Sequence, residues 1–231
     1  LAWLIKTPIA VQILFVAGLL VAARRRVTVG LLLLFPAALY MLAATRSELL
    51  LGVRLVLPAF PFVVLLGGFA IRQALETRRG QVAVVVLLGW LAGASAFIYP
   101  HGISYFNEWV KGPSEGWKYM VDSNVDWGQN LPELARYIRQ NRIEKVKLYY
   151  FGFDKLHRYG LEKQVEMQAP PWGPDLVQGT KPKLVPGWYG VSVTLLPGHL
   201  FPKEYRDYFQ YFRERRPDAR AGYGIFLYRV L

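Results

Sequence analysis

The chain has 231 residues, of which 53% are hydrophobic, and it carries a formal net charge of +12 and no cysteine. Without cysteine, its folded parts are held together by their cores rather than by disulfide bonds. Part of the basic charge sits in short runs between apolar segments, a pattern that predicts membrane anchoring and gives no reason to expect a nucleic-acid partner.

Four apolar runs fill most of the first hundred residues. They comprise residues 9–23, 27–44, 55–71 and 82–99. With their flanking residues, they approach the roughly 17 to 25 residues that a helix needs to cross about 30 Å of hydrocarbon. Four such runs without a polar stripe are difficult to bury in a chain of this length. We therefore predict four transmembrane helices within a region spanning residues 1–99.

Basic residues in the connections predict how these helices are oriented. Arginines stand both between the first two runs and between the last two: Arg24, Arg25, Arg26, Arg72, Arg78 and Arg79. Because cytoplasmic loops retain basic residues, both connections are expected in the cytoplasm. The start of the chain, the loop 45–54 and residues 100–231 are then expected outside. This predicts a multi-pass protein of the cytoplasmic (inner) membrane with its C-terminal domain on the extracytoplasmic side.

Residues 100–231 mix aromatics, prolines and charges as a folded domain does. Asn130, followed three residues later by Glu133, matches a capping box, so a helix should begin there. In chain order we expect a helix at 131–141, a strand at 145–151, a surface loop at 153–186, a strand at 188–196, a helix at 205–215 and a strand at 221–230. The predicted fold is a transmembrane helical bundle followed by a small extracytoplasmic α/β domain, with helices packed on one sheet.

Aromatic residues recur within the predicted helix 205–215: Tyr205, Tyr208, Phe209, Tyr211 and Phe212. Such a set can form a carbohydrate-binding platform. At helical spacing, however, all of them except Tyr211 lie on one face, which favours packing in the core.

A polar segment, residues 122–130, precedes the predicted helix 131–141 and carries the densest group of chemically capable side chains. Asn124 and Gln129, together with Asn107, can exchange hydrogen bonds with sugar hydroxyls, while Trp127 can stack on a sugar face. Alternatively, Trp127 anchors a core and the polar groups satisfy the backbone of a turn. Both interpretations stay open at the level of sequence.

Asp122 and Asp126 could also bind a divalent cation through their oxygens. Their i,i+4 spacing in an irregular segment gives that idea little support, and none of the three histidines has metal-ligand spacing. We therefore predict no metal site and no cofactor, and keep both aspartates as candidate substrate-binding residues.

Several short motifs occur in an order that resembles one family. They are Lys6-Thr7-Pro8, Arg54 with Leu57-Pro58 and Pro61, Ser104-Tyr105-Phe106-Asn107-Glu108, the segment from Asp122 to Gln129, Gly190-Val191-Ser192-Val193 and Arg216-Pro217-Asp218-Ala219. Their order, spacing and placement on the predicted outer face carry the resemblance. On these residues the chain resembles the C-terminal portion of bacterial multi-span glycosyltransferases, which are similar to the dolichyl-phosphate-mannose protein mannosyltransferases and the lipid A aminoarabinose transferases.

The resemblance implies a C-type transferase whose donor is a polyprenyl-phosphate-linked sugar. Its partners would be that donor, membrane lipid and an acceptor that the sequence does not identify. In such enzymes an acidic residue in the first extracytoplasmic loop is the usual candidate base. That loop would precede Leu1, in keeping with a chain that begins inside an apolar stretch. No catalytic residue is therefore assigned within this sequence.

Arg54 and Lys6 are the basic residues expected nearest to a lipid phosphate, because each lies at the outer end of a predicted span. A guanidinium binds phosphate oxygens in bidentate fashion, and an ammonium could neutralise a phosphate leaving group. The alternative is that both side chains anchor the helices at the headgroups. Two positions depart from the family pattern: Leu55 replaces a tyrosine that commonly follows the arginine, and Asn130 replaces an aspartate.

The sequence thus predicts an integral-membrane glycosyltransferase that works at the outer face of the cytoplasmic membrane. The alternative is a noncatalytic, membrane-anchored domain that binds cell-envelope carbohydrate. The candidate substrate-binding residues are Lys6, Arg54, Asn107, Asp122, Asn124, Asp126, Trp127 and Gln129.

Overall fold

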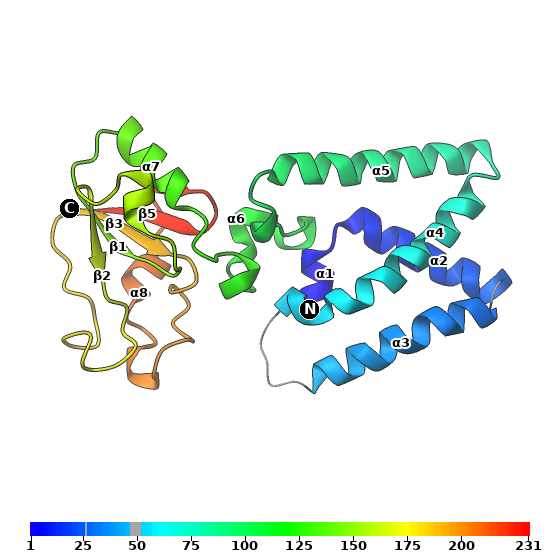
Figure 1. Cartoon of the computed structure of the whole chain (residues 1–231), viewed down its shortest axis with the longest axis horizontal. Coiled ribbons are helices and arrows are strands. Elements are labelled where there is room, and N and C mark those ends of the chain that lie inside the picture. The colour runs from blue at the N-terminus through cyan, green and yellow to red at the C-terminus, as the bar shows by residue number, and fades with distance from the viewer. Residues whose placement is uncertain (26, 47–51) are drawn as a thin grey trace. The chain divides into compact units, whose positions relative to one another are not determined.

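The computed structural model describes residues 1–25, 27–46 and 52–231, which divide into two compact units, Leu1–Pro113 and Ser114–Leu231 (Figure 1). Residues 100–113, which the sequence assigned to the second domain, belong to the first unit. The reason is that Asn107 bonds back to the first helix, its backbone N–H donating to the Ile5 carbonyl at 2.9 Å. The two units are described separately below.

The first unit is helical. Its elements are α1 (Ala2–Lys6), α2 (Ile9–Arg25), α3 (Val27–Thr45), the 3-10 helix η1 (Gly52–Ala59), α4 (Phe60–Ala74), α5 (Arg78–Ile98), and the 3-10 turns η2 (Gly102–Ser104) and η3 (Glu108–Val110). Within the described residues, three helical stretches are long and apolar enough to cross a membrane: Val27–Ala44, Gly52–Ala74 and Arg78–Ile98. They correspond to three of the four predicted spans. The first predicted span also forms a helix, α2, but its 17 residues make it shorter than the other three.

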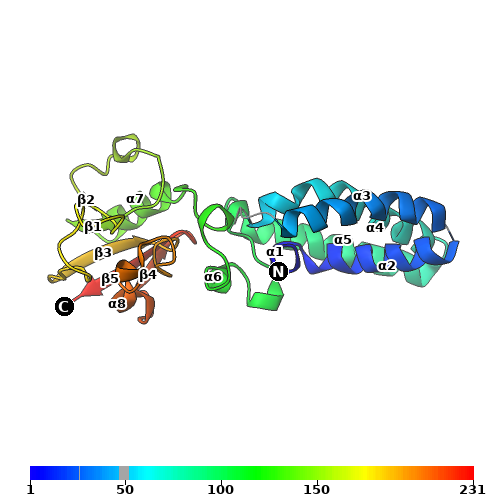
Figure 2. The same cartoon turned by 90° about the horizontal axis from the view of Figure 1, so that it is seen from below.

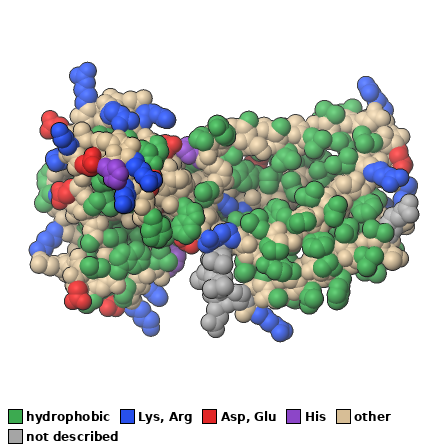
Figure 3. Space-filling model, viewed as in Figure 1, with side chains coloured by type: hydrophobic (Ala, Val, Ile, Leu, Met, Phe, Trp, Pro, Cys, Tyr) green, Lys and Arg blue, Asp and Glu red, His purple; other side chains and the backbone are tan. Residues whose placement is uncertain are grey.

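Apolar side chains face outward on these helices. On α3, Leu31, Leu32 and Phe35 are exposed, and on α5 the same holds for Val85 and Val86. Figure 3 shows hydrophobic side chains spread over the helices on the face in view. Lipid is the surrounding in which so much exposed apolar surface is stable, so the structure supports a membrane protein.

Close backbone contact joins α2 to α4. A Cβ atom added to Gly18 would lie 1.9 Å from the Leu66 carbonyl oxygen, and one added to Gly67 would lie 3.4 Å from the Leu14 Cβ. Small residues allow helices to approach in this way where a membrane removes the hydrophobic drive for association. The α2–α4 pair is therefore specified by glycine at position 18.

Both basic connections lie at the same end of the helical unit. The Arg25 guanidinium, at the end of α2, lies 3.9 Å from the Glu76 carboxylate, which stands between α4 and α5. Thr77 then caps α5 by accepting a hydrogen bond from the Gly80 N–H at 3.1 Å. This arrangement is the one required if both connections face one side of a membrane. Arg26, and residues 47–51 of the predicted outer loop, lie outside the described residues.

The second unit is a small α/β domain. Its elements are α6 (Pro113–Gly116, at the boundary), the 3-10 turn η4 (Asp122–Asn124), α7 (Leu131–Gln140), β1 (Val146–Tyr149), the 3-10 turn η5 (Leu156–Tyr159), β2 (Val165–Gln168), β3 (Gly187–Ser192), the 3-10 turn η6 (Lys203–Tyr205), α8 (Gln210–Arg213), β4 (Ala219–Ala221) and β5 (Ile225–Val230).

The five strands form one mixed sheet in the order β2-β1-β3-β5-β4. β1 runs parallel to β2 and to β3, whereas β5 is antiparallel to β3 and β4. Alternation along β1 separates two cores: Leu148 packs with α7 on one face, while the Tyr149 ring contacts Phe209 on the other at 5.0 Å between centroids. Figure 2 shows α7 and α8 on opposite faces of the sheet.

Several predicted elements are confirmed. The helix at 131–141 is α7 and the strand at 145–151 contains β1. The aromatic set is largely core, as predicted, because only Tyr211 is exposed among its five members.

Other predicted elements occur with different bounds, or are wrong. The strand at 188–196 ends at Ser192, where a turn begins, and the helix at 205–215 is reduced to η6, turns and α8. The single final strand is a hairpin of β4 and β5, since Gly222 takes a positive φ of 58° in the turn. The loop 153–186 contains β2. Asn130 does not cap α7 with its side chain, which instead accepts a hydrogen bond from the Gly224 N–H at 3.0 Å.

Candidate functional site

The predicted site residues fall into two separate regions. Lys6, Arg54 and Asn107 belong to the helical unit, whereas the residues of the segment 122–130 belong to the second unit. Each region has its own geometry and its own chemistry.

In the helical unit, Asn107 fixes the end of α1. Its side-chain amide donates to the carbonyls of Leu4 and Thr7 at 2.6 and 2.7 Å, and its side-chain oxygen accepts the Trp109 N–H at 3.1 Å. Gln12 donates to the same two carbonyls, at 2.7 and 2.8 Å. Both ends of the Asn107 amide are thus engaged within the fold. The prediction that Asn107 binds a sugar stays a prediction, and its observed contacts are structural.

Lys6 is held at the C-terminal end of α1. Its ammonium donates to the Ile103 carbonyl at 2.7 Å and lies 4.3 Å from the centre of the Phe106 ring. Burial lowers the pKa of Lys6 to about 7, because the charged form loses hydration there. A nearby anion would reverse this effect by favouring the ammonium. A negatively charged group bound nearby would therefore raise the pKa of Lys6.

Arg54 stands on η1, with its side chain exposed to the surroundings. η1 packs against α1, the helix that ends at Lys6. The fold thus brings the two segments that carry the predicted phosphate-binding residues against each other, although these residues are 48 positions apart in the chain. Two basic groups near one end of the helices form a suitable setting for a phosphate.

A cavity of about 340 Å³ in the helical unit lies beside residues 105–108. Its walls include Trp90 and Phe97 of α5 together with Tyr105, Phe106 and Glu108. The Trp90 indole N–H donates to the Glu108 carboxylate at 2.9 Å, which fixes one polar group in a mainly apolar wall. The Phe106 ring is shared between this cavity and Lys6. The sequence does not indicate that Trp90 and Glu108 are neighbours, because they come together only where the chain folds back after α5.

In the second unit, the segment 122–130 is mostly buried. Asn124 and Asp126 are buried, Asp122 and Gln129 are partly buried, and Trp127 is 44% exposed. The Asn124 amide donates to the Val121 carbonyl at 3.2 Å. The Gln129 side chain donates to the Val125 carbonyl at 2.9 Å and accepts the Trp127 N–H at 2.7 Å. These contacts favour the interpretation in which the amides satisfy a turn, and the exposed Trp127 ring packs edge-on against Phe153 at 6.4 Å between centroids.

Asp126 is the most unusual group of this segment. It is fully buried, and one carboxylate oxygen accepts the Gly128 N–H at 2.9 Å. The other oxygen has no hydrogen-bond partner within the part of the chain that the structure describes. Burial raises the pKa of Asp126 to about 7, and the charge of Asp122 adds to the rise, while the Gly128 N–H and the nearby Ser192 hydroxyl oppose it. The carboxyl group therefore binds a proton close to neutral pH.

Backbone contacts tie the segment to the end of the sheet. The Tyr150 hydroxyl, just after β1, donates to the Gly128 carbonyl at 2.6 Å. Gly128 has a φ of 85°, and a Cβ atom there would meet the Gly152 Cα at 2.8 Å. Thr194, just after β3, accepts the Asp122 N–H at 3.1 Å. The segment thus lies at the carboxyl ends of β1 and β3, the edge at which open α/β sheets commonly bind ligands.

The cation hypothesis for Asp122 and Asp126 gains no support from the neighbouring side chains. Among residues 1–25, 27–46 and 52–231, no group of three or more His, Asp or Glu side chains could hold a metal ion.

Comparison with known proteins adds no relative: no protein-family model matches the chain, and neither the curated proteins nor the solved structures include a significant match.

Proposed function

We propose that the chain is the C-terminal part of an integral-membrane glycosyltransferase, which moves a sugar from a polyprenyl-phosphate carrier to an acceptor at the outer face of the cytoplasmic membrane. The observation that carries the proposal is the setting of Lys6 at one end of a helical unit with membrane-length helices. The ordered motifs that resemble this glycosyltransferase family support it as well.

The charge of the lipid phosphate changes during the proposed reaction, and Lys6 suits that change. The donor is a phosphodiester with one negative charge. When the bond between sugar and phosphate breaks, the leaving phosphate gains a second negative charge. An ammonium whose pKa is lowered by burial interacts most strongly with the more charged product, and so stabilises charge as it develops.

Arg54 complements this role from the neighbouring segment. Its guanidinium can bind two phosphate oxygens at once, whereas the Lys6 ammonium acts as a point charge. Because η1 packs against α1, both groups belong to the same end of the helical unit. We assign Arg54 to holding the donor and Lys6 to the departing phosphate.

The catalytic base is not assigned within this chain. Asp126, the one carboxyl group among the described residues with a pKa raised to about 7, is fully buried and lies in the second unit. An acidic residue that precedes Leu1 is the proposed base. The second unit is proposed to face outward and to shape the acceptor side, with Trp127 as its exposed contact.

The test uses the full-length protein in lipid nanodiscs with a polyprenyl-phosphate-linked hexose as probe. Lys6→Met keeps an unbranched apolar stem and removes the charge. Loss of one charge-assisted hydrogen bond should weaken binding of free polyprenyl phosphate, the product, roughly tenfold or more, and binding of the donor probe less. Polyprenol, which lacks the phosphate, should bind both proteins equally. Lys118→Met is the matched control, because Lys118 is a lysine of the second unit paired with Glu115 at 2.6 Å.

Transfer is measured in the same preparations as release of free polyprenyl phosphate. Release by the wild type, with a lower rate in Lys6→Met and an unchanged rate in Lys118→Met, would support the proposal. A wild type that binds polyprenyl-phosphate-hexose no better than polyprenol would refute it. A wild type that releases no polyprenyl phosphate with any sugar would favour the noncatalytic alternative.

A further inference from the structure

A second hollow lies in the second unit, away from the segment 122–130. It has a volume of about 270 Å³ and lies between the chain near Lys181 and the stretch that leads into α8. Tyr208 and Tyr211 contribute aromatic walls, while Asp207, Gln210 and Glu214 contribute polar side chains. We call this hollow the α8 groove.

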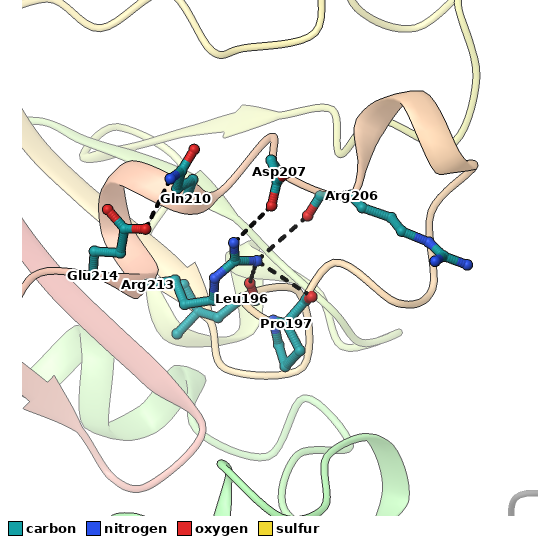
Figure 4. A network of polar contacts seen from close by, with 7 residues as sticks. All are labelled: Leu196, Pro197, Arg206, Asp207, Gln210, Arg213 and Glu214. Atoms are coloured by element: carbon teal, nitrogen blue, oxygen red, sulfur yellow. Dashed lines mark hydrogen bonds and ion pairs between the residues drawn. The ribbon is translucent and has the colours of Figure 1, made fainter.

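Arg213 holds one wall of the α8 groove in place. Its guanidinium pairs with Asp207 at 2.7 Å and donates to the carbonyls of Leu196, Pro197 and Arg206 at 3.3 to 3.4 Å. Figure 4 shows this guanidinium at the centre of the network, with Asp207 on one side. A carboxylate fixed in advance loses little side-chain freedom when it binds a ligand. Asp207 is therefore preorganised even though it is exposed.

The polar groups of the α8 groove are mainly acceptors. Asp207 uses one oxygen for Arg213, and Glu214 uses one for the Gln210 amide at 2.8 Å. The second oxygen of each carboxylate makes no hydrogen bond in the described part of the chain. Each can accept from a hydroxyl group. Lys181 adds a donor at the opposite wall.

Tyr211 supplies the apolar contact. It is 38% exposed, whereas the neighbouring Tyr208 is buried and its ring packs on Phe209 at 5.1 Å between centroids. The Tyr211 ring rests edge-on against Phe212 at 5.3 Å between centroids, while Arg215 bonds its hydroxyl and places its guanidinium over the ring, 5.1 Å from the centre. It is thus a rigid ring on the surface, with its position set by two neighbours. Such a ring offers large contact area at little cost in conformational entropy.

A saccharide matches this combination of groups. Its hydroxyl groups donate to carboxylate and amide oxygens, and its C–H faces pack on an aromatic ring. An anionic ligand matches the lining less well, because two carboxylates, those of Asp207 and Glu214, face one ammonium, that of Lys181, among the side chains that line the groove. A purely apolar ligand would leave the carboxylates without partners and would have to strip their water.

We propose that the α8 groove binds a neutral or amino saccharide, with Tyr211 as the stacking ring and Asp207 and Glu214 as hydroxyl acceptors. Under the proposed function, this saccharide belongs to the acceptor. Saccharide binding in the α8 groove does not depend on the lipid-linked donor. Failure of one proposal therefore leaves the other standing. Because the groove is shallow and its polar groups are exposed, we expect dissociation constants of about 0.1 to 1 mM.

The test is isothermal titration of the full-length protein in detergent. The probes are neutral trisaccharides of glucose, mannose, galactose and N-acetylglucosamine, a glucosamine trimer, and a trimer of a uronic acid. Tyr211→Ala should weaken the best neutral or amino probe at least tenfold, and Glu214→Gln about threefold or more. Tyr119→Ala and Glu162→Gln, which change an exposed tyrosine and an exposed acid outside the groove, should bind as the wild type does.

The results of the titrations either support or overturn the proposed binding in the α8 groove. Binding that Tyr211→Ala and Glu214→Gln weaken, and that Lys6→Met leaves unchanged, supports the groove whatever the transfer assay shows. No binding of any neutral or amino probe at about 20 mM, a preference for the uronic acid trimer, or equal affinity in all variants would overturn it. Glu214→Gln alters only an exposed side chain, so it decides the question if Tyr211→Ala fails to fold.

Discussion

Replacing Asp126 with asparagine should make the second unit more stable at neutral pH and remove much of its pH dependence. The carboxyl group is fully buried, and its pKa is raised from 3.8 to about 7. In the unfolded chain the group loses its proton near pH 4, whereas in the folded chain it keeps the proton until about pH 7. Rising pH between these values therefore favours unfolding.

The size of the effect follows from the pKa rise. Each pH unit between about 4 and 7 costs about 1.4 kcal/mol, so the full loss is about 4 kcal/mol, of which roughly 3 kcal/mol falls between pH 5 and pH 8. The asparagine side chain would resemble the protonated acid in shape and would not titrate. The stability of Asp126→Asn relative to the wild type should therefore rise by roughly 3 kcal/mol from pH 5 to pH 8.

Hydrogen exchange of the full-length protein in detergent measures this difference, read from the amides of β1 and β3 and corrected for intrinsic rates. The matched control is Asp175→Asn, which removes a carboxyl group from an exposed position of the same unit. It should give a constant difference from the wild type across the pH range. A constant difference for Asp126→Asn as well would refute the reasoning, because it would mean that the buried group keeps its ordinary pKa.

Three further substitutions test the contacts that build the fold. Asn107→Leu removes the amide that donates to two carbonyls near the end of α1, and should lower the stability of the helical unit by about 1 to 3 kcal/mol. Gly18→Val places a Cβ against the Leu66 carbonyl and should sharply reduce folded protein in the membrane, measured as detergent-soluble monodisperse yield. Tyr150→Phe loses the buried bond to the Gly128 carbonyl and should cost about 1 to 2 kcal/mol in urea unfolding of the second unit.

Each of these substitutions has a control that the structure supplies. Gly89→Ala changes a glycine whose added Cβ meets nothing within 4 Å, so its yield should match the wild type. Asn141→Leu removes an amide that makes an exposed bond to the Tyr137 carbonyl, and should cost less than Asn107→Leu. Tyr119→Phe alters an exposed hydroxyl and should leave urea unfolding unchanged. Equal effects in a variant and its control would contradict the assigned contact.

Local signals in the sequence predicted the elements that depend on local physics. Apolar length was sufficient for α3, α4 and α5, and helical spacing was sufficient for α7. Tyr208, Phe209 and Phe212 were assigned to the core from periodicity alone, and they are buried. In each case the residues that specify the element belong to that element itself.

The missed features depend on contacts between distant residues. Asn130 matches a helix cap, yet its side chain turns to the Gly224 N–H, 94 positions away. The predicted helix 205–215 is interrupted, and its Arg213 side chain donates to the carbonyls of Leu196 and Pro197 outside that stretch. Nothing near either residue in the sequence indicates its partner.

The candidate site, too, has features that the sequence predicted and features that depend on distant contacts. Lys6 and Arg54 were chosen from their positions beside apolar runs, and their segments do pack together. The polar segment 122–130 was notable for its composition, but composition does not distinguish a buried turn from an exposed loop. Burial of Asp126 by the ends of β1 and β3 is a property of the assembled sheet. The sequence indicated which side chains have suitable chemistry, but it did not indicate which of them a ligand can reach.

The length of α2 bears on the depth at which a lipid headgroup meets the protein. Its 17 residues measure roughly 26 Å, a few ångströms less than the hydrocarbon core of a typical bilayer. A bilayer accommodates a short helix by thinning around it. Under the proposed function, in which α2 crosses the membrane as the first predicted span, the headgroups beside it would move inward toward Lys6 and Pro8, which stand just before this helix. A helix that is slightly too short would thereby deliver a lipid phosphate to a lysine that a thicker membrane would leave out of reach.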